Sequence, residues 1–418
     1  MHNTILDKEV KQKIKNIKTA DIIIGIPSFN NAKTINHVIK AVQAGLVKYF
    51  SNKKAVIVNS DGGSKDGTME IVKNTTIDDY ESIIFHHKLG PITKISFPYH
   101  GIPGKGSALR SIFQIAKELN AQACAVVDSD LKSITPEWIE LLIKPQLDEG
   151  YDFVAPLYQR HKFDGTITNN IIYPLTRTLY GKHIRQPIGG EFGFSGRLAE
   201  FYLNQNVWNT DVTRYGIDIW MTTTAVACGY KICQSFLGAK IHDPKDPATN
   251  LSTMLYQVVS SAFFCMTLYE NIWTKINHSE SVPTFGFQYT IASEAINVNI
   301  NKMIEKFLLG TKDLIHIWKN FLNDKIISSL EEIKSVPLKK FHISDELWTE
   351  IIYSFAAAYH KNILNKEHLI RLLTPLYIAR TASFIIENYN SNMEEVEAKI
   401  EKLCKTFEQK KSLLIKQW

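Results

Sequence analysis

The sequence predicts an α/β fold with a mostly parallel central sheet, followed by an all-helical region. Short apolar runs alternate with longer stretches of helical periodicity in the first part of the chain, as in units of strand, helix and strand. From about residue 251 onward, strand signals nearly vanish and helical periodicity dominates. We therefore expect two domains, residues 1–250 and residues 251–418.

The elements of the first domain are expected in a regular order. A lysine-rich opening extends to about residue 20, and the apolar run at 22–27 predicts a strand that its proline ends. Further along, the patterns predict a helix at 34–50, a strand at 55–59, a weaker strand near 83–85, a helix ending at 120 and a strand at 123–127. The stretch 135–239 mixes helices with irregular segments, the form that a pocket built on a sheet usually takes.

The second domain is expected to consist of helices. Helical periodicity covers 251–273, 301–321, 345–360, 366–389 and 393–415, with linkers at 279–287 and 335–344. The aromatic residues of this region stand at helical spacing, so we expect them in a core or in an oligomer interface.

Composition and charge restrict the class of protein. The chain has 418 residues, 44% of them hydrophobic and 22% charged, which are ordinary values for a globular protein. The net charge is +6 and the lysines are spread along the chain, so we expect attraction of anionic substrates and no nucleic-acid binding. The five cysteines form no Cys-x-x-Cys pair, which argues against a disulfide scaffold or a zinc site and favours a reducing compartment.

The N-terminal sequence lacks the charged segment and the apolar core of a secretion signal. We identify no segment with the roughly 18 consecutive apolar residues of a membrane span. We therefore expect a cytoplasmic protein without a membrane partner.

Asp128 and Asp130 form the most informative motif. They stand two residues apart at the end of an apolar strand, and side chains alternate along a strand, so both carboxylates leave the sheet on the same side. Together they can share one hard cation. Mn²⁺ or Mg²⁺ held in this way binds a diphosphate and neutralises the charge of a departing phosphate. Two aspartates at this spacing often occur by chance, so the other motifs of the chain decide whether the pair indicates a metal site.

His242 is the candidate third ligand of this cation. A lone histidine at a strand end is more often a satisfied structural group than a ligand. Asp243 and Pro244 follow it in a polar stretch, which predicts a loop with room for a metal ion.

The loop 60–68 follows the second predicted strand, at the edge where open α/β sheets place their ligands. Asp61 is expected to accept hydrogen bonds from a nucleobase or a ribose, and the neighbouring glycines allow the backbone to approach closely. The alternative is a helix-capping loop in which Asp66 and Thr68 satisfy free amides. The segment 27–30, which follows the first strand, favours the nucleotide pocket.

The glycine-rich segment 101–107 differs from the phosphate-binding loop of NTPases, because four residues must separate the first glycine of that loop from its Gly-Lys-Ser/Thr. A glycine-rich turn that opens a helix still presents backbone amides to an anion. We expect Lys105 to contact the diphosphate or the sugar of a donor, and the alternative is a solvent-exposed lysine.

Two further carboxylates are candidates for the same pocket. Glu191 follows two glycines, a pattern typical of a tight pocket wall, and could hold sugar hydroxyls; the alternative is a surface glutamate after a turn. Asp218 stands at the head of an apolar helix, where an acid that stabilises the helix dipole is an equally good interpretation.

Taken together, these motifs resemble the retaining GT-A glycosyltransferases of the group that contains mannosylglycerate synthase, glucosylglycerate synthase and glucosyl-3-phosphoglycerate synthase. The matching segments are Pro-Gly-Lys-Gly at 103–106, the Asp128 and Asp130 pair with 136–139, Gln-Pro-Ile-Gly-Gly-Glu at 186–191, Gly-Ile-Asp at 216–218, and His242 followed by 253–255. They span about residues 20–260. The segments 345–348 and 358–360 are also similar to the tail of mannosylglycerate synthase.

The resemblance implies a GT-A fold and assigns roles to individual residues. It implies that Asp128, Asp130 and His242 hold Mn²⁺ or Mg²⁺. The catalytic residues that we expect are Glu191, Asp218 and Lys105. The expected donor-binding residues are Pro27, Ser28, Asn30, Asp61, Gly104, Lys105, Asp128, Ser129, Gly190 and Glu191. The expected acceptor-binding residues are Arg160, Thr166 and Thr168, and the rigid fork of an arginine suits a carboxylate.

Two departures from the pattern concern the substrates. Relatives that use phosphoglycerate carry an arginine where this chain has Gly-Thr-Ile-Thr at 165–168, which favours unphosphorylated glycerate as acceptor. The Ser-Asp-Gly-Gly-Ser loop at 60–64 resembles the phosphoglycerate group more than the mannosyl group, so the donor stays open.

The resemblance implies a transferase that moves glucose or mannose from a GDP- or UDP-sugar to the 2-hydroxyl of D-glycerate with retention. The alternatives are a 3-phosphoglycerate acceptor, an inverting family-2-like transferase of polysaccharide synthesis, and a non-catalytic sugar-nucleotide sensor or scaffold. We also expect a homo-oligomer.

Overall fold

The computed structural model describes residues 6–75, 92–99, 104–214, 216–241, 247–289, 299–337 and 340–418, with the backbone alone for 247–252. The strand predicted near 83–85 and the predicted ligand His242 lie outside these residues.

The chain divides into two compact units. Unit 1 contains Met1–Gln159, Ile184–Lys245 and Val282–Ile291, and unit 2 contains Arg160–His183, Asp246–Ser281 and Ala292–Trp418. The chain thus passes between the units several times. The single boundary at residue 250 stays a prediction.

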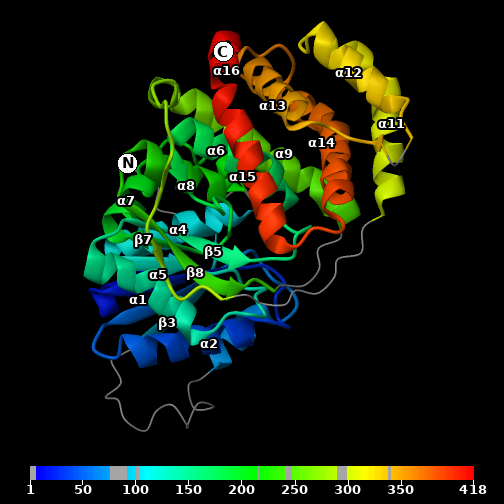
Figure 1. Cartoon of the computed structure of the whole chain (residues 1–418). Helices are drawn as coiled ribbons and strands as arrows, with labels where there is room; N and C mark the ends of the chain where they lie inside the picture. The colour runs from blue at the N-terminus through cyan, green and yellow to red at the C-terminus, as the bar shows by residue number, and fades with distance from the viewer. Residues whose placement is uncertain are drawn as a thin grey trace. The chain divides into compact units, whose positions relative to one another are not determined.

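Unit 1 is built around a central sheet (Figure 1). Its strands are β1 (Ile22–Ser28), β2 (Ala55–Asp61), β3 (Ile92–Pro98), β4 (Ala123–Val126), β5 (Phe153–Gln159), β7 (Phe192–Ser195), β8 (Ile232–Ala239) and β10 (Thr284–Phe285). They follow the order β10-β8-β5-β7-β4-β1-β2-β3, and every pair is parallel except those that β7 makes with β4 and β5. The predicted α/β class with a mostly parallel, GT-A-like sheet is confirmed.

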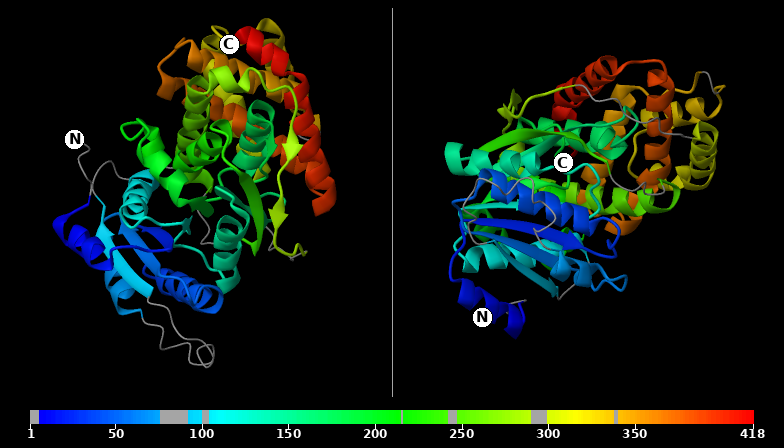
Figure 2. Two further views of the ribbon diagram at one scale, coloured as in Figure 1. Left: turned by 90° about the vertical axis from the view of Figure 1, so that its left-hand side faces the viewer. Right: turned by 90° about the horizontal axis from the view of Figure 1, so that it is seen from below.

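Helices cover both faces of this sheet (Figure 2). In unit 1 they are α1 (Lys8–Ile17), α2 (Ile35–Tyr49), α3 (Thr68–Asn74), α4 (Lys105–Glu118), α5 (Pro136–Glu149), α7 (Gly196–Leu203), the short turn η3 (Asp211–Thr213) and α8 (Ile217–Ala227). On one face the isoleucines of β1 form a buried core with α2 and α5. On the other face α4 lies so close to β1 that a Cβ on Gly25 would be 2.7 Å from Ile112. This packing fixes the first turn of α4 near the carboxyl ends of the strands.

Unit 2 is mainly helical, as predicted for the C-terminal region. It contains η2 (Thr168–Ile172), α6 (Tyr173–Tyr180), β6 (Lys182–His183), α9 (Pro247–Leu268), α10 (Glu270–Trp273), β9 (Glu280–Ser281), α11 (Ile300–Trp318), α12 (Asp324–Lys334), α13 (Asp345–His360), α14 (Lys366–Asn388), α15 (Met393–Gln409) and α16 (Lys411–Gln417). Its aromatic residues Trp318, Trp348, Tyr353 and Phe355 are fully buried, so they belong to the core of the unit.

Helix α14 is long and apolar enough to cross a membrane by length and composition. It does not stand out in the sequence, because charged residues interrupt its apolar run. In the structure 67% of its apolar window is buried inside the protein, where it contacts α9, α11 and α13. A core helix passes the same test, so α14 is weak evidence for a membrane span.

The stretch 135–239 is more regular than the sequence predicts. It contributes β5, β7 and β8 to the sheet. The residues of these strands explain why the sequence does not predict them. Pro156 lies inside β5, β7 has only four residues, and β8 carries the buried polar pair Gln234 and Ser235 within its apolar run. Strand β3 and helix α12 were also missed, and the predicted linker 279–287 contains β9 and β10.

Candidate active site

The loops after β1, β2 and β4 lie together, because the carboxyl ends of parallel neighbours meet at one edge of the sheet. Side chains connect them directly. Thr34 Oγ1 donates to the carbonyl of Ser129 at 2.7 Å, and Ser129 Oγ donates to Asn31 Oδ1 at 2.8 Å. The two loops predicted to bind the donor therefore form one surface with the Asp128 loop.

Asp61 is buried at the end of β2, and its own loop occupies its carboxylate. Oδ1 accepts from the amides of Gly63 (2.9 Å) and Ser64 (2.7 Å), and Oδ2 accepts from the hydroxyls of Ser28 and Ser64, both at 2.7 Å. Pro27 pairs with Ser60 in the neighbouring strand. Asp61 and Ser28 thus shape the loop from beneath, and direct contact with a nucleotide stays a prediction.

Asn30 also links the loops after β1 and β2. It adopts a positive φ of 55°, and its Oδ1 accepts from the amide of Lys65 at 3.0 Å. Nearby, Asp66 accepts from Ala32 and from Thr68, so the capping role considered for these residues is present alongside the proposed pocket.

Lys105 brings two of the predicted carboxylates together. Its ammonium, at the first residue of α4, lies 2.8 Å from Asp128 Oδ1 and 3.2 Å from Asp218 Oδ1, and it donates to the carbonyl of Gly190 at 2.9 Å. Its side chain is only 10% exposed, so the alternative of a solvent-exposed lysine is wrong. Asp218 occupies the first turn of α8, so it also has the position expected of a dipole-stabilising acid.

Lys240 holds the third carboxylate. It follows β8, and its ammonium lies 2.8 Å from each carboxylate oxygen of Glu191, 3.2 Å from Asp128 Oδ2 and 2.7 Å from the carbonyl of Gly189. The hydroxyl of Tyr158 donates to Glu191 Oε2 as well. Glu191 is fully buried, so the alternative of a surface glutamate is wrong.

The two lysines therefore share Asp128 and the turn that precedes Glu191. Each ammonium contacts a different oxygen of Asp128, and each binds one of the successive carbonyls of Gly189 and Gly190. We call Lys105, Asp128, Glu191, Asp218 and Lys240 the lysine–carboxylate cluster.

Burial and neighbouring charges shift the pKa values of the carboxyl groups in this cluster in different directions. Burial raises the pKa of Glu191 to about 7, against the lowering effect of Lys240. Burial also raises the pKa of Asp218, against the effect of Lys105. For Asp128 burial acts in the same direction, but Lys105 and Lys240 hold its pKa well below the ordinary value. Burial lowers the pKa of Lys105, and Asp128 and Asp218 outweigh it, so this pKa is raised.

Glycine is required at the centre of the cluster. Gly190 has a φ of 98°, and a Cβ there would lie 2.5 Å from Asp128 Oδ2 and 3.0 Å from Lys240 Nζ. A Cβ on Gly189 would lie 2.2 Å from Pro156 Cγ. A side chain at position 190 would displace Asp128 and Lys240, and one at position 189 would push the turn away from β5.

Gly104 and Gly106 on either side of Lys105 allow a close approach of η3. A Cβ on Gly104 would lie 2.6 Å from the carbonyl oxygen of Thr213, and one on Gly106 would lie 2.2 Å from that of Val212. The glycine-rich segment therefore serves packing as well as ligand access, and the start of α4 is fixed against the chain that leads into α8.

The described residues offer part of a metal site. Asp128 is partly exposed and Asp130 stands in the turn that follows it, and such carboxylates suit the hard ions Mn²⁺ and Mg²⁺. Within the described part of the chain no group of three or more His, Cys, Asp or Glu could hold a metal ion. The third predicted ligand, His242, lies outside that part.

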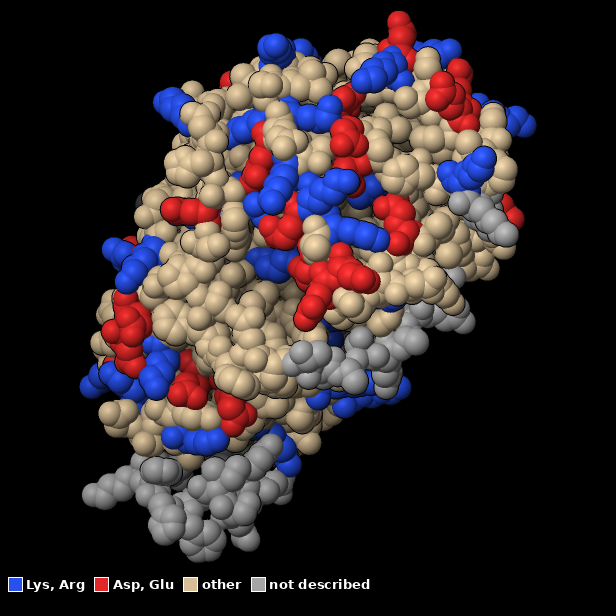
Figure 3. Space-filling view, viewed as in Figure 1, with Lys and Arg blue, Asp and Glu red and all other residues tan. Residues whose placement is uncertain are grey.

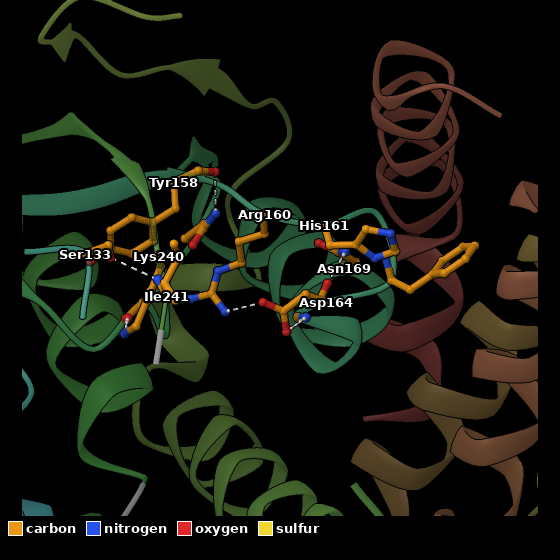
Figure 4. Close-up of polar contacts among 12 residues, drawn as sticks. Ser133, Tyr158, Arg160, His161, Asp164, Asn169, Lys240 and Ile241 are labelled. Atoms are coloured by element: carbon orange, nitrogen blue, oxygen red, sulfur yellow. Dashed lines mark hydrogen bonds and ion pairs between the residues drawn. The ribbon is translucent and has the colours of Figure 1, made fainter. Parts of the chain in front are cut away.

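The residue before His242 is fixed beside the Asp128 loop. The amide of Ile241 donates to Ser133 Oγ at 2.9 Å, as Figure 4 shows, and the amide of Lys132 donates to the carbonyl of Ile241 at 2.9 Å. The residue that precedes His242 in the chain is thus bonded to this loop, and the predicted role of His242 stays a prediction.

The predicted acceptor residues belong to unit 2. Arg160 directly follows β5, and its Nη1 lies 3.4 Å from Asp164 Oδ2 (Figure 4). Thr166 Oγ1 lies 2.5 Å from the hydroxyl of Tyr377, and Thr168 begins η2. Their role in acceptor binding stays a prediction.

Lys240 and Tyr158 are two members of the site that were not predicted from the sequence. Both stand at or next to the end of a strand that was not predicted either, and the one local signal is that Lys240 stands two residues before the candidate ligand His242. The alternation of side chains along β5 and β8 could have identified them, had those strands been recognised.

Charged side chains of both signs intermingle on the face that Figure 3 shows. This distribution agrees with the mild net charge of +6 and gives no support to a nucleic-acid surface on that face.

One family model matches part of the chain. Residues 23–207 match the family described as Glycosyl transferase family 2. The matched segment begins in β1, ends after α7, and includes Lys105, Asp128 and Glu191. The chain thus contains a GT-A-like domain that matches glycosyl transferase family 2 over this segment.

Several solved structures of one enzyme are similar to the chain. Glucosyl-3-phosphoglycerate synthase from Mycobacterium tuberculosis, in complex with Mn²⁺, UDP and glucosyl-3-phosphoglycerate, is 22% identical over 61% of this chain and 83% of its own, with a TM-score of 0.45. Its complex with Mn²⁺, UDP and phosphoglyceric acid is 21% identical, with coverages of 61% and 81% and a TM-score of 0.44. No curated protein sequence matches the chain.

Proposed function

We propose that the protein is a metal-dependent hexosyltransferase. It moves glucose or mannose from a GDP- or UDP-sugar to the 2-hydroxyl of D-glycerate with retention of configuration. The observation that carries the proposal is the lysine–carboxylate cluster at the ligand-binding edge of a GT-A-like sheet.

The charges of the cluster support a substrate that carries a cation and a diphosphate. Asp130 adds a carboxylate to the same loop as Asp128, and neighbouring carboxylates of this kind suit a divalent cation. Lys105 stands at the N-terminal end of α4, where the helix dipole adds to its attraction for an anion. Asp128, Asp130 and His242 would hold Mn²⁺ or Mg²⁺, which would supply charge neutralisation at the leaving diphosphate.

The contacts of Glu191 bear on the route of transfer. Both of its oxygens are held by Lys240, one is also bonded to Tyr158, and the side chain has no exposed surface. A carboxylate held in this way is poorly placed to attack a sugar. These contacts argue against a covalent route through Glu191 and support the proposed same-face reaction, in which a leaving-phosphate oxygen takes the acceptor proton; a covalent route through Asp218, the residue proposed to stand beside the sugar, is the alternative.

Unphosphorylated glycerate is the acceptor that fits the local charge best. Arg160 is the arginine assigned to the acceptor carboxylate, and Asp164 already lies 3.4 Å from it. The stretch 165–168 adds no second arginine. A single, partly neutralised guanidinium matches one carboxylate better than the additional charge of a phosphate.

A screen of donors and acceptors tests the proposal. Purified protein is incubated with Mn²⁺, UDP- or GDP-linked glucose or mannose, and D-glycerate, 3-phosphoglycerate or lactate, and the products are read by mass spectrometry. We expect a hexosylglycerate whose anomeric configuration, read by NMR, equals that of the donor. An inverted product would identify the inverting alternative, and a product formed only with 3-phosphoglycerate would overturn the assignment of the acceptor.

A further inference from the structure

Lys240 is a buried cation that the proposed reaction does not yet use. Its side chain is 6% exposed, and its ammonium contacts both oxygens of Glu191, Oδ2 of Asp128 and the carbonyl of Gly189. The ammonium also lies 5.5 Å from the centre of the Tyr158 ring. Every described polar contact of this ammonium is therefore with the chain segments that form the cluster.

These contacts connect three separate pieces of the sheet. Lys240 follows β8, Asp128 follows β4, and the turn at 189–191 leads into β7. Since β5 lies between β8 and β7 in the sheet, the ammonium bridges the loops of strands that are not neighbours. Removing it would leave Glu191 buried without the ammonium that contacts both of its oxygens.

We propose that Lys240 is a positioning residue of the transfer site. It acts through Glu191: it fixes the turn at 189–191, and its contact with Asp128 holds that turn against the Asp128 loop. This inference rests on the proposed transferase function, and it adds a residue that neither the motif resemblance nor the matched family segment includes.

A purely structural ion pair is the competing explanation, and the two make different predictions. A structural lysine would lower the amount of folded protein and leave the turnover of each folded molecule unchanged. A positioning lysine would lower kcat of the folded enzyme, and its effect would depend on the presence of the Glu191 carboxylate.

The experiment is a double-mutant cycle with Lys240→Met and Glu191→Gln. Turnover is normalised to the folded fraction, measured by circular dichroism. Lys144→Met is the control, because Lys144 is 57% exposed and contacts Glu140 on the same helix. We expect Lys240→Met to lower kcat by about 10–100-fold, the usual loss when a group that orients site residues is removed, with a smaller change in KM for the donor. Lys144→Met should behave as wild type.

The cycle also tests whether Lys240 acts through the Glu191 carboxylate. In the Glu191→Gln background, Lys240→Met should cost much less than it does in the wild type. Equal losses in the two backgrounds, or a normal kcat for folded Lys240→Met, would overturn the inference.

Failure of the transferase proposal is recognisable separately. A wild-type protein that turns over no donor would refute that proposal. The same cycle is then measured on the affinity for UDP and GDP by calorimetry in the presence of Mn²⁺. Non-additive losses of affinity support the role of Lys240, and additive losses or none contradict it.

Discussion

The ammonium of Lys105 lies 2.8 Å from Oδ1 of Asp128, which joins the first residue of helix α4 to the loop after strand β4. A helix N-terminus and a carboxylate predicted to bind a metal thus meet through an ion pair between a buried lysine and a partly exposed aspartate. The proposed donor, a diphosphate with its cation, is expected to engage both ends of this pair.

Lys105→Ala should lower kcat by about 100–1,000-fold, the usual cost of losing one group that stabilises charge in a transition state. The reason is that Lys105 is the cation proposed to face the leaving diphosphate. Steady-state kinetics measure the effect. Lys117→Ala is the control, since Lys117 lies on the same helix and pairs with Glu200 at the surface. Equal rates for the two variants would remove Lys105 from the reaction.

Asp130→Ala and His242→Ala should each abolish turnover, because both residues are predicted to ligate the divalent cation. Treatment of the wild type with EDTA should also abolish turnover. Added Mn²⁺ should then restore the activity of the wild type but not that of either variant. Turnover is followed by nucleotide release. A variant that keeps a near-normal rate with saturating Mn²⁺ would exclude its residue from the ligand set.

Gly190→Ala should inactivate the protein through a steric effect. The new Cβ would lie 2.5 Å from Asp128 Oδ2, and the φ of 98° adds about 1–2 kcal/mol of backbone strain. Gly229→Ala is a matched control, since Gly229 also has a positive φ of 74° but a Cβ there would have no described heavy atom within 4 Å. Both variants should lose some thermal stability, and activity should be lost in Gly190→Ala alone. An active Gly190→Ala would show that the Asp128 contact tolerates displacement.

Asp152 should make stability depend on pH. Burial raises the pKa of this carboxyl, but hydrogen bonds from Arg197, Ser195 and the amide of Lys231 outweigh burial, so the folded pKa lies below the ordinary 3.8. The stabilisation is therefore present above 3.8 and is lost as pH falls through the folded pKa.

Asp152→Asn measures this contribution. The difference in Tm between wild type and variant should be largest at neutral pH and should shrink as pH falls below 3.8. A difference that stays constant over the acidic range would show that the ionised form of Asp152 makes no special contribution.

The sequence predicts those parts of the fold whose pattern is local. β4 is apolar throughout, and β1 and β2 begin with apolar runs and turn polar only at their carboxyl ends, because parallel strands covered on both faces need apolar residues. β5 and β8 interrupt that pattern with Pro156 and Gln234, and Gln234 is satisfied by a tertiary contact, the bond from the amide of Arg185 to its Oε1. Such tertiary contacts cannot be predicted from the local sequence pattern.

The same limit applies to the site. Lys105, Asp128 and Glu191 were recognised because glycines or a paired carboxylate mark them, and the structure brings all three together. Lys240 has no such local mark, since its importance comes from the approach of three loops that are distant in sequence. Asp61 was assigned to the ligand from its position at a strand end, whereas its carboxylate already accepts four hydrogen bonds from the protein.

The most direct test of the proposed site is a crystal structure of the protein grown with Mn²⁺ and either UDP or GDP. We predict one ion at about 2.0–2.6 Å from oxygens of Asp128 or Asp130 and from a nitrogen of His242, and bound to the diphosphate. A diphosphate bound away from Lys105, or an imidazole of His242 remote from both carboxylates, would contradict this prediction.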